Sequence, residues 1–241
     1  WAEPEFAGAV VRDVRDSTGA GLKEVVVEAS DELIAAYAVP GQFVQLRPNP
    51  DAKAGFFAIA SAPGKASSAG TLEFLIKSTD STEWLTGAAG GLDVQMCAPM
   101  GKGFNLAPLK SGEPPCTNVA LCVAGSGIAP IRAVIEAGAL GGLPAQLFYG
   151  ARTMDTMAYR DRFEAWTALG VQVLPVLSRA EAADGYSNGY VQDALAASAG
   201  LLRDPPKGTG ILLCGMKEMA EAIKAFAAGE GIPENRVLTN F

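Results

Sequence analysis

Short apolar runs with partly alternating polar positions make up the first half of the chain, from Glu3 to about Leu109. Clusters of Gly, Pro, Asp and Ser separate these runs at intervals that are typical of antiparallel barrels and sandwiches. We therefore predict that this half is all-β. The clearest strand candidates lie at residues 24–28, 41–46, 72–76 and 94–97.

The pattern changes after residues 110–115, which contain Gly112, Pro114 and Pro115. Buried strands now alternate with helix-period segments, an alternation that predicts a parallel sheet with crossover helices. We expect two domains, a β-barrel over residues 1–112 and an α/β domain over residues 113–241. The predicted strands are 119–124, 145–149, 171–177, 211–214 and 236–238, and the predicted helices are 131–137, 159–169, 189–197 and 216–228.

The composition is that of a folded globular protein, and it disfavours some classes of binding partner. Hydrophobic residues make up 49% of the 241 positions, and the formal net charge is −7. A negative balance disfavours nucleic acids and anionic membranes as partners. The longest apolar stretch, near residues 120–131, is interrupted by Gly125, Gly127 and Pro130, so it is shorter than the roughly 18 residues of a membrane span. We expect neither a membrane span nor nucleic-acid binding.

The chain contains no histidine. This absence excludes Ser-His and Cys-His catalytic pairs and removes the commonest zinc ligand, which disfavours hydrolase chemistry. No CxxC motif is present, so neither a zinc site nor an iron–sulfur site is indicated and we expect no metal. The four cysteines are Cys97, Cys116, Cys122 and Cys214.

The strongest local motif joins the strand ending at Ala124 to Gly125-Ser126-Gly127 and a helix. Glycines allow a sharp turn and close approach of a ligand, and the N-terminus of a helix attracts phosphate. A tight turn without any ligand is the alternative, because two glycines alone are weak evidence. Pro130 replaces the third glycine of the usual dehydrogenase motif, and the next strand, 145–149, is not followed by a carboxylate. Both departures disfavour an ordinary NAD dehydrogenase.

Four ordered segments resemble the ferredoxin–NADP reductase superfamily, and in particular a plant and algal branch of FAD/NAD(P)-binding oxidoreductases. This resemblance spans nearly the whole chain and implies a Greek-key, FAD-binding β-barrel followed by a nicotinamide-binding α/β domain. It implies that Gly125, Ser126, Gly127, Ile128 and Pro130 belong to the pyrophosphate turn for NAD(P). The segments are residues 125–130, Tyr149-Gly150-Ala151-Arg152, Leu177-Ser178-Arg179 and Cys214-Gly215-Met216.

In the same resemblance, Ser178 and Arg179 stand where NADP-preferring members hold the 2′-phosphate, and Arg152 follows the neighbouring strand. A guanidinium offers paired donors to a phosphate, so NADP is favoured over NAD. The alternative is that these are ordinary surface residues, with Arg152 paired to Asp155 or Asp161.

The flavin side of the resemblance rests on residues 55–61. Phe57 stands where members carry a tyrosine stacked on the flavin ring, and Ala58 and Ile59 complete the implied FAD-binding strand. Gly55 replaces an arginine that neutralises the pyrophosphate, and Ala58 replaces a hydroxyl near the reactive edge of the ring. We expect hydride transfer that is slower than in members with the hydroxyl.

Three further segments complete the implied site. Ser81 and Thr82 resemble the turn that contacts the FAD phosphates, with simple capping of the following helix as the alternative. Cys214, together with Gly215 and Met216, would face the nicotinamide, the alternative being a buried structural thiol. Phe241 would cover the flavin face opposite Phe57, unless it is only a frayed terminus.

The implied function is an FAD-containing NAD(P)H oxidoreductase that moves hydride between NADPH and flavin and passes electrons to an unidentified acceptor, as a diaphorase does. The net charge of −7 disfavours acidic ferredoxin as that acceptor. The alternative is a non-catalytic flavin- or nucleotide-binding subunit of a larger electron-transfer assembly. Residue 1 is Trp rather than Met, so we expect a removed transit peptide and a chloroplast location, with the cytoplasm as the alternative.

Overall fold

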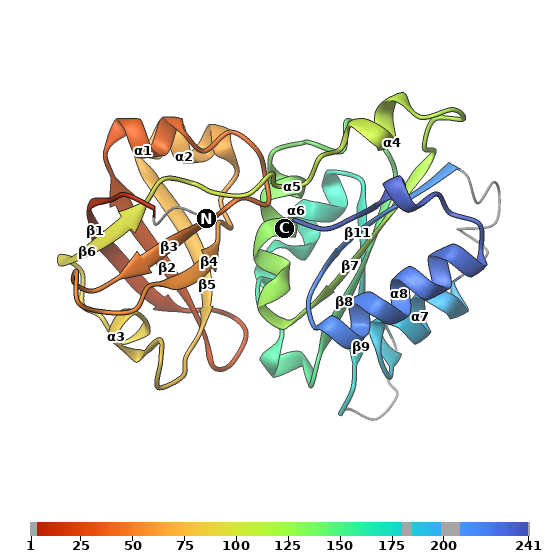
Figure 1. Cartoon of the computed structure of the whole chain (residues 1–241). Coiled ribbons are helices and arrows are strands. Elements are labelled where there is room, and N and C mark those ends of the chain that lie inside the picture. Colours follow the sequence, from red (N-terminus) through yellow and green to blue (C-terminus); the bar gives the residue numbers. More distant parts are fainter. Residues whose placement is uncertain (1–3, 180–184, 199–207, 241) are drawn as a thin grey trace.

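Two lobes, each built on its own sheet, lie side by side in the computed structural model of the chain (Figure 1). The structure describes residues 4–179, 185–198 and 208–240. The predicted two-part architecture, an antiparallel barrel followed by a parallel α/β sheet, is confirmed for these residues.

The first lobe is an antiparallel sheet with the strand order β4-β3-β6-β1-β2-β5. An isolated bridge between Ile59 and Phe74 connects the two ends of this order, so the sheet curves into a nearly closed barrel. Its strands are β1 (Phe6–Asp16), β2 (Leu22–Ala29), β3 (Phe43–Arg47), β4 (Gly55–Ala58), β5 (Thr71–Lys77) and β6 (Leu92–Cys97).

Alternation of side chains forms the interior of this barrel. In β2, for example, Val25 and Val27 are fully buried while Val26 between them is only partly so, as expected of a strand with one inward face. Short helices cover the barrel ends and connect its strands. They are α1 (Asp31–Ala35), α2 (Pro63–Ala69) and α3 (Glu83–Thr86).

The second lobe is a parallel sheet with the strand order β10-β9-β8-β7-β11-β12. Its strands are β7 (Asn118–Ala124), β8 (Ala145–Ala151), β9 (Val171–Leu177), β10 (Ser187–Asn188), β11 (Thr209–Cys214) and β12 (Val237–Leu238). Its helices are α5 (Ile128–Glu136), α6 (Phe163–Ala168), α7 (Val191–Ala197) and α8 (Lys217–Gly229).

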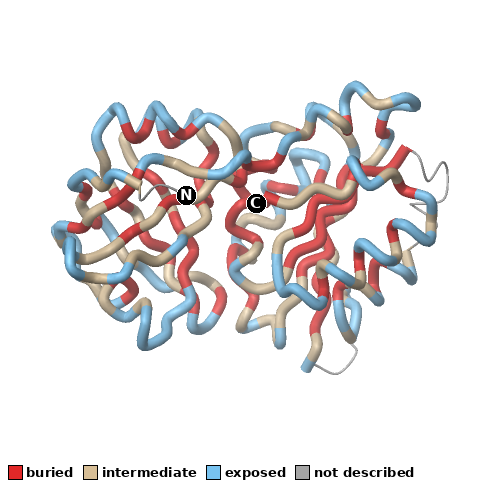
Figure 2. The backbone as a smooth tube through the Cα atoms, in the orientation of Figure 1, coloured by how far each residue is buried: buried red, intermediate tan, exposed pale blue. Residues whose placement is uncertain are grey.

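These helices cover both faces of the parallel sheet. Figure 1 shows α5 and α6 between the sheet and the barrel, and α7 and α8 on the outer face. Residues 128–135 of α5 are all buried because the sheet covers one side of this helix and the barrel the other, as the red segment at the lobe boundary in Figure 2 shows. An apolar sequence all round a helix is what such a position requires.

Two predicted helices need correction. The segment 159–169 begins with Tyr159 at a φ of 60°, continues as a 3-10 helix over Arg160–Arg162, and only then becomes α6. The left-handed backbone at Tyr159 interrupts the regular helix that periodicity alone predicts. The predicted helix at 189–197 likewise begins later, at Val191, after Gly189 with its φ of 116°.

The connection between the lobes runs from the end of β6 to the start of β7 and contains the short helix α4 (Ala107–Ser111). Our boundary between residues 112 and 113 falls within this connection and stays a prediction. The lobes also share a hydrophobic core, in which Leu75 and Phe104 of the first half pack with Ile131 and Val134 of α5.

A hairpin of the barrel docks directly on the second lobe. The backbone N–H of Ala20 donates to the carbonyl of Asp155 at 2.6 Å, and the N–H of Arg160 donates to the hydroxyl of Thr18 at 3.0 Å. Gly19 lies between them, and a Cβ at this position would be 2.7 Å from the nitrogen of Ala158. At Gly19 the backbone of the hairpin therefore contacts the backbone of Met157 and Ala158 with no side chain between them.

Two negative findings apply to the described ranges 4–179, 185–198 and 208–240. No helix there is long and apolar enough to cross a membrane. No group of three or more His, Cys, Asp or Glu side chains gathers there in a way that would hold a metal ion. The four cysteines are free thiols.

We predict that Gly19→Ala destabilises the protein by about 1–3 kcal/mol, because the added methyl group forces apart two well-packed backbone segments. Urea unfolding followed by circular dichroism measures this change. Gly64→Ala, at a helical site where an added Cβ meets nothing within 4 Å, is the matched control and should not lower stability. Equal stability of Gly19→Ala and the wild type would contradict the docking described here.

Candidate functional site

The candidate site lies at the carboxyl edge of the parallel sheet, where β7 and β11 are neighbours. The chain adds β8 and β9 on one side of β7 and β11 and β12 on the other, so the topology reverses at this point. Ligands of open α/β sheets bind in the crevice outside such a switch point.

At this edge of the sheet the turns after β7 and β11 pack closely against each other. A Cβ on Gly127 would overlap the carbonyl oxygen of Cys214 and lie 2.8 Å from its carbonyl carbon. A Cβ on Gly215 would lie 3.2 Å from the nitrogen of Ala124 and 2.7 Å from the terminal carbon of Met219. The turns after β7 and β11 therefore fit together only because both carry glycine.

The predicted pyrophosphate turn begins with a 3-10 helix over Gly125–Gly127, and α5 begins at Ile128. Gly125 has a φ of 55° and open space beside its Cα, and Ser126 is exposed. No side chain caps the N-terminus of α5. Exposed backbone at an uncapped helix start attracts anions.

The other two residues of this predicted turn have a structural role. Ile128 and Pro130 are buried within α5, so their side chains anchor the helix in the core and only their backbone borders the turn. The hydroxyl of Tyr149 supports the turn from β8: it donates to the carbonyl of Gly125 at 3.4 Å and accepts from the N–H of Ala158 at 3.1 Å.

The structure brings Arg152, Ser178 and Arg179 together beyond the ends of β8 and β9. The backbone N–H of Arg179 donates to the carbonyl of Arg152 at 2.9 Å, and the N–H of Ser178 donates to that of Ala151 at 3.0 Å. Both arginines are exposed. Within the described part of the chain neither forms an ion pair, so the alternative pairing of Arg152 with Asp155 or Asp161 is not observed.

Cys214 lies at the end of β11, and its carbonyl group is in close contact with the turn at Gly127. Burial raises the pKa of its thiol to about 11, so the group is neutral at neutral pH. Gly215 and Met216 follow on the surface, and Met216 is 58% exposed. A large exposed apolar side chain beside the crevice is available for ligand contact.

On the barrel, the predicted flavin strand is β4, which forms one end of the sheet order. Phe57 pairs with the buried Val44 and packs against the barrel core while remaining partly exposed. Ala58 is also partly exposed, and Ile59 is fully buried. Of the three predicted residues, Phe57 and Ala58 thus retain accessible surface.

Gly55 and Phe57 depend on each other. A Cβ on Gly55 would lie 2.9 Å from two atoms of the Phe57 ring. The Phe57 ring therefore occupies the space that a larger side chain at position 55 would need.

Sequence reasoning overlooked Phe56. It pairs with Gln45, points away from Phe57, and is 66% exposed. Its ring lies 5.8 Å from that of Phe43 between centroids. Two adjacent aromatic residues in a strand were the available signal, since one of them must face outward.

Thr82 is the N-cap residue of α3, as the capping alternative expected, but its side chain makes no capping hydrogen bond. The Thr82 hydroxyl instead donates to the carbonyl of Lys77 at 2.6 Å and accepts from the N–H of Thr79 at 3.0 Å. Ser81 is exposed, with its hydroxyl 3.1 Å from that of Thr79. These bonds bind residues 77–82 into a compact turn of hydroxyl groups.

The C-terminal segment returns to the barrel. Asn240 is 3% exposed and donates from its side-chain amide to the carbonyl of Gly41 at 3.1 Å. Phe241, which we predicted to cover the flavin, lies outside the described residues. The hydrogen bond of Asn240 holds the last described residue against the barrel.

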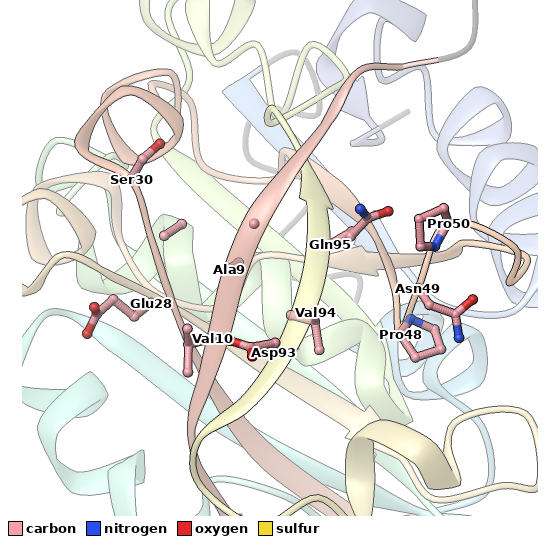
Figure 3. Close-up of a pocket in the computed structure, with 12 residues that line it drawn as sticks. Ala9, Val10, Glu28, Ser30, Pro48, Asn49, Pro50, Asp93, Val94 and Gln95 are labelled. Carbon is pink, nitrogen blue, oxygen red and sulfur yellow. The ribbon is translucent and has the colours of Figure 1, made fainter.

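The hollows that the structure shows lie elsewhere. One, of about 570 Å³, is an open trough on the barrel that runs over β1 from Glu28 and Ser30 to Asn49, Pro50 and Gln95 (Figure 3). Another, of about 270 Å³, lies at the amino edge of the parallel sheet. No predicted site residue lines either of them.

Comparison with known proteins matches residues 121–225 to the model of the oxidoreductase NAD-binding domain. Fruit protein pKIWI502 of Actinidia deliciosa is 33% identical over 228 residues, which cover 90% of this chain and 71% of that protein.

Among solved structures, the ferredoxin NADP+ reductase of Neisseria gonorrhoeae with bound FAD and NADP superimposes with a TM-score of 0.78 at 18% identity, covering 98% of each chain. The CS-b5R domains of human Ncb5or in the NAD+ form also give 0.78, at 18% identity, covering 100% of this chain and 70% of that one. The Amycolatopsis cytochrome P450 reductase GcoB gives 0.78 at 21% identity, covering 99% and 70%.

At these identities the solved structures show that the fold is shared. The relative from Actinidia deliciosa and the domain model show similarity in sequence as well. Both agree with the glycine turns that meet at the switch point. The chain belongs to the ferredoxin–NADP reductase superfamily.

Proposed function

We propose that this protein is an FAD-containing NAD(P)H oxidoreductase that accepts hydride from NADPH and passes electrons to an acceptor, as a diaphorase does. The observation that carries the proposal is the meeting of the Gly127 and Cys214 backbones at the switch point of the parallel sheet. In support, the similar Neisseria reductase was solved with both FAD and NADP.

The residues present fit a nicotinamide nucleotide. The open side of Gly125 and the uncapped start of α5 suit a pyrophosphate. Across the crevice, Cys214, Gly215 and Met216 would border the nicotinamide ring. These groups bind and orient the nucleotide, which is what hydride transfer requires of a protein.

NADP is the nucleotide that we assign to this site, with NAD as the weaker alternative. Arg152 and Arg179 lie on backbone segments that are hydrogen-bonded to each other. Neither arginine has a carboxylate partner in the ranges that the structure describes, so both guanidinium groups offer paired donors to a phosphate. Ser178 adds a hydroxyl beside them. A guanidinium matches the geometry of a phosphate better than a point charge does.

The barrel residues fit the flavin ring better than they fit its pyrophosphate. Phe57 and Ala58 offer an apolar surface at the end strand β4, whereas Gly55 offers no charge. The turn with Ser81 and Thr82 would hold the phosphates through hydroxyl and backbone groups. When bound, FAD supplies the hydride acceptor, and Phe241 is proposed as the ring that covers its other face.

The protein's own residues supply no proton in this proposal. The chain has no histidine, and the Cys214 thiol, with its pKa of about 11, stays protonated. Cys214 thus packs against the nicotinamide rather than acting as a nucleophile. Its neutral side chain also helps to exclude water from the crevice.

We further propose that the acceptor is a small molecule, a quinone or a protein other than ferredoxin, because the net charge of −7 repels an acidic partner. A plastid location and membership of the plant and algal branch belong to the same proposal. The 33% identity to a protein of Actinidia deliciosa supports the branch.

A second candidate is a non-catalytic flavin- or nucleotide-binding subunit of an electron-transfer assembly. The observation that favours it is the pair Gly55 and Ala58, which removes both the charge and the hydroxyl that family members place around the flavin.

One experiment separates the two candidates. The purified chain, loaded with FAD, is mixed anaerobically with NADPH while flavin absorbance is followed, and dye reduction is then measured under turnover. Bleaching of the flavin and NADPH-dependent dye reduction support the reductase. Tight NADPH binding by calorimetry without bleaching would support the subunit instead. We expect bleaching to be slower than in relatives with a hydroxyl at the position of Ala58.

We predict that Arg179→Ala weakens NADPH binding by about tenfold or more, because a hydrogen bond to a charged group contributes ~1.5–3 kcal/mol. NADH binding should change by less than about twofold, since the lost contact is to the 2′-phosphate. Isothermal titration calorimetry with both nucleotides measures the ratio. Arg12→Ala, which removes an exposed arginine paired with Glu28 on the barrel, is the control; equal weakening in both variants would refute the assignment.

We predict that Gly127→Ala lowers nucleotide affinity by at least about tenfold, because a 1 Å displacement of a binding element carries costs of this size. The new methyl group pushes the turn at Gly127 away from Cys214. Gly229→Ala, where an added Cβ meets nothing within 4 Å, should bind NADPH normally. The idea fails if Gly127→Ala folds and binds NADPH as the wild type does.

A further inference from the structure

A cluster of ion pairs around the fully buried side chain of Arg132 joins the two lobes. Arg132 of α5 has no exposed side-chain surface, and its guanidinium pairs with the carboxylate of Glu73 on barrel strand β5. Lys65 of α2 binds the other oxygen of Glu73 at 2.6 Å. Lys65 and Glu73 belong to one lobe, so the contact that crosses between lobes is that of Arg132.

On the barrel side, Glu73 is tied to the predicted flavin strand. Its carbonyl accepts from the N–H of Ala60 at 2.7 Å, and its N–H donates to the hydroxyl of Ser61 at 3.1 Å. These two residues follow Ala58 and Ile59 directly. A shift of Glu73 would therefore move the end of the strand that we assign to the flavin.

On the other side, Arg132 is held firmly within α5, little more than one helical turn after Gly127. Its Nε donates to Glu136 at 3.0 Å and its Nη1 to the hydroxyl of Tyr159 at 3.3 Å, with the guanidinium 4.8 Å above the Tyr159 ring. Glu136 also binds Arg162 at 3.2 Å and Trp166 at 3.3 Å. The helix and the guanidinium thus move as one body.

The pair keeps its charges at neutral pH. Burial by itself raises the pKa of Glu73, but the attraction of Arg132 and the hydrogen bonds from Lys65 and Arg132 outweigh this and hold the pKa below its usual value. An ionised pair with little water around it has a well-defined geometry. The fork shape of arginine makes that geometry specific in a way that lysine cannot reproduce.

We propose that Arg132 is a positioning residue: through Glu73 it sets the separation between the flavin strand β4 and the nucleotide turn at Gly127. This inference rests on the proposed function, since the separation matters for hydride transfer. Hydride transfer needs the reacting atoms about 3–3.5 Å apart. Shared apolar packing alone tolerates small sliding of the lobes, whereas the buried pair penalises it.

The test compares Arg132→Lys with Lys65→Gln in the full chain. Both substitutions alter a cation that contacts Glu73, but only the first affects the contact between lobes. In FAD-loaded protein, Arg132→Lys should slow flavin reduction by NADPH by roughly tenfold to a hundredfold, with NADPH affinity changed by less than about threefold. Lys65→Gln should stay within about twofold of the wild type for both quantities.

A second readout does not depend on turnover. Hydrogen exchange of the chain as purified reports local opening at Ala60 and along α5. Arg132→Lys should speed exchange in both lobes, while Lys65→Gln should speed it in the barrel alone. If Arg132→Lys does not fold, Glu73→Gln, which keeps the side-chain length and an acceptor, replaces it and should give the same two-lobe exchange pattern.

The outcomes are distinct. Equal effects of Arg132→Lys and Lys65→Gln on exchange, or normal flavin reduction in Arg132→Lys, would overturn the positioning role. If NADPH does not reduce the flavin of the wild type, the proposed function is wrong. Faster hydrogen exchange in both lobes of Arg132→Lys would then still support the coupling by Arg132.

Discussion

The close packing of two backbone turns, at Gly127 after β7 and at Cys214 after β11, is the constraint on which the site depends. No side chain fits between them. The sheet order reverses at this pair of strands, which is where ligands of open α/β sheets bind, and glycine at the turns leaves the backbone accessible to a ligand. Tyr149 and the buried residues of α5 hold the turn in place from behind.

The second requirement is that the barrel present its end strand to this crevice at a defined separation. Three kinds of contact do so: the hairpin at Thr18 and Gly19, a shared apolar core, and the pair of Arg132 with Glu73. The first two bring the lobes together. The charged pair differs from them in its place, because Glu73 is hydrogen-bonded to Ala60 and Ser61, which continue β4.

The departures at Gly55 and Ala58 are consistent with a protein whose redox chemistry resides in bound cofactors. The ring of Phe57 lies over Gly55, so the strand exchanges a charge for an apolar surface. In the function that we propose, a chain without histidine and with a protonated Cys214 thiol contributes by binding and orienting its cofactors.

Local sequence was sufficient for most of the strands, the change from barrel to α/β lobe and the glycine turns, because backbone conformation and side-chain alternation act over a few neighbouring residues. It did not single out β1 or β10. It was not sufficient for contacts between distant residues. Arg132 and Glu73 are 59 positions apart, and the packing of Phe57 over Gly55 required the direction in which β4 faces the barrel. The same holds for Thr82, whose hydroxyl serves Lys77 and Thr79 rather than a helix end. Which buried polar groups find each other depends on how the lobes pack, and only the folded chain specifies that.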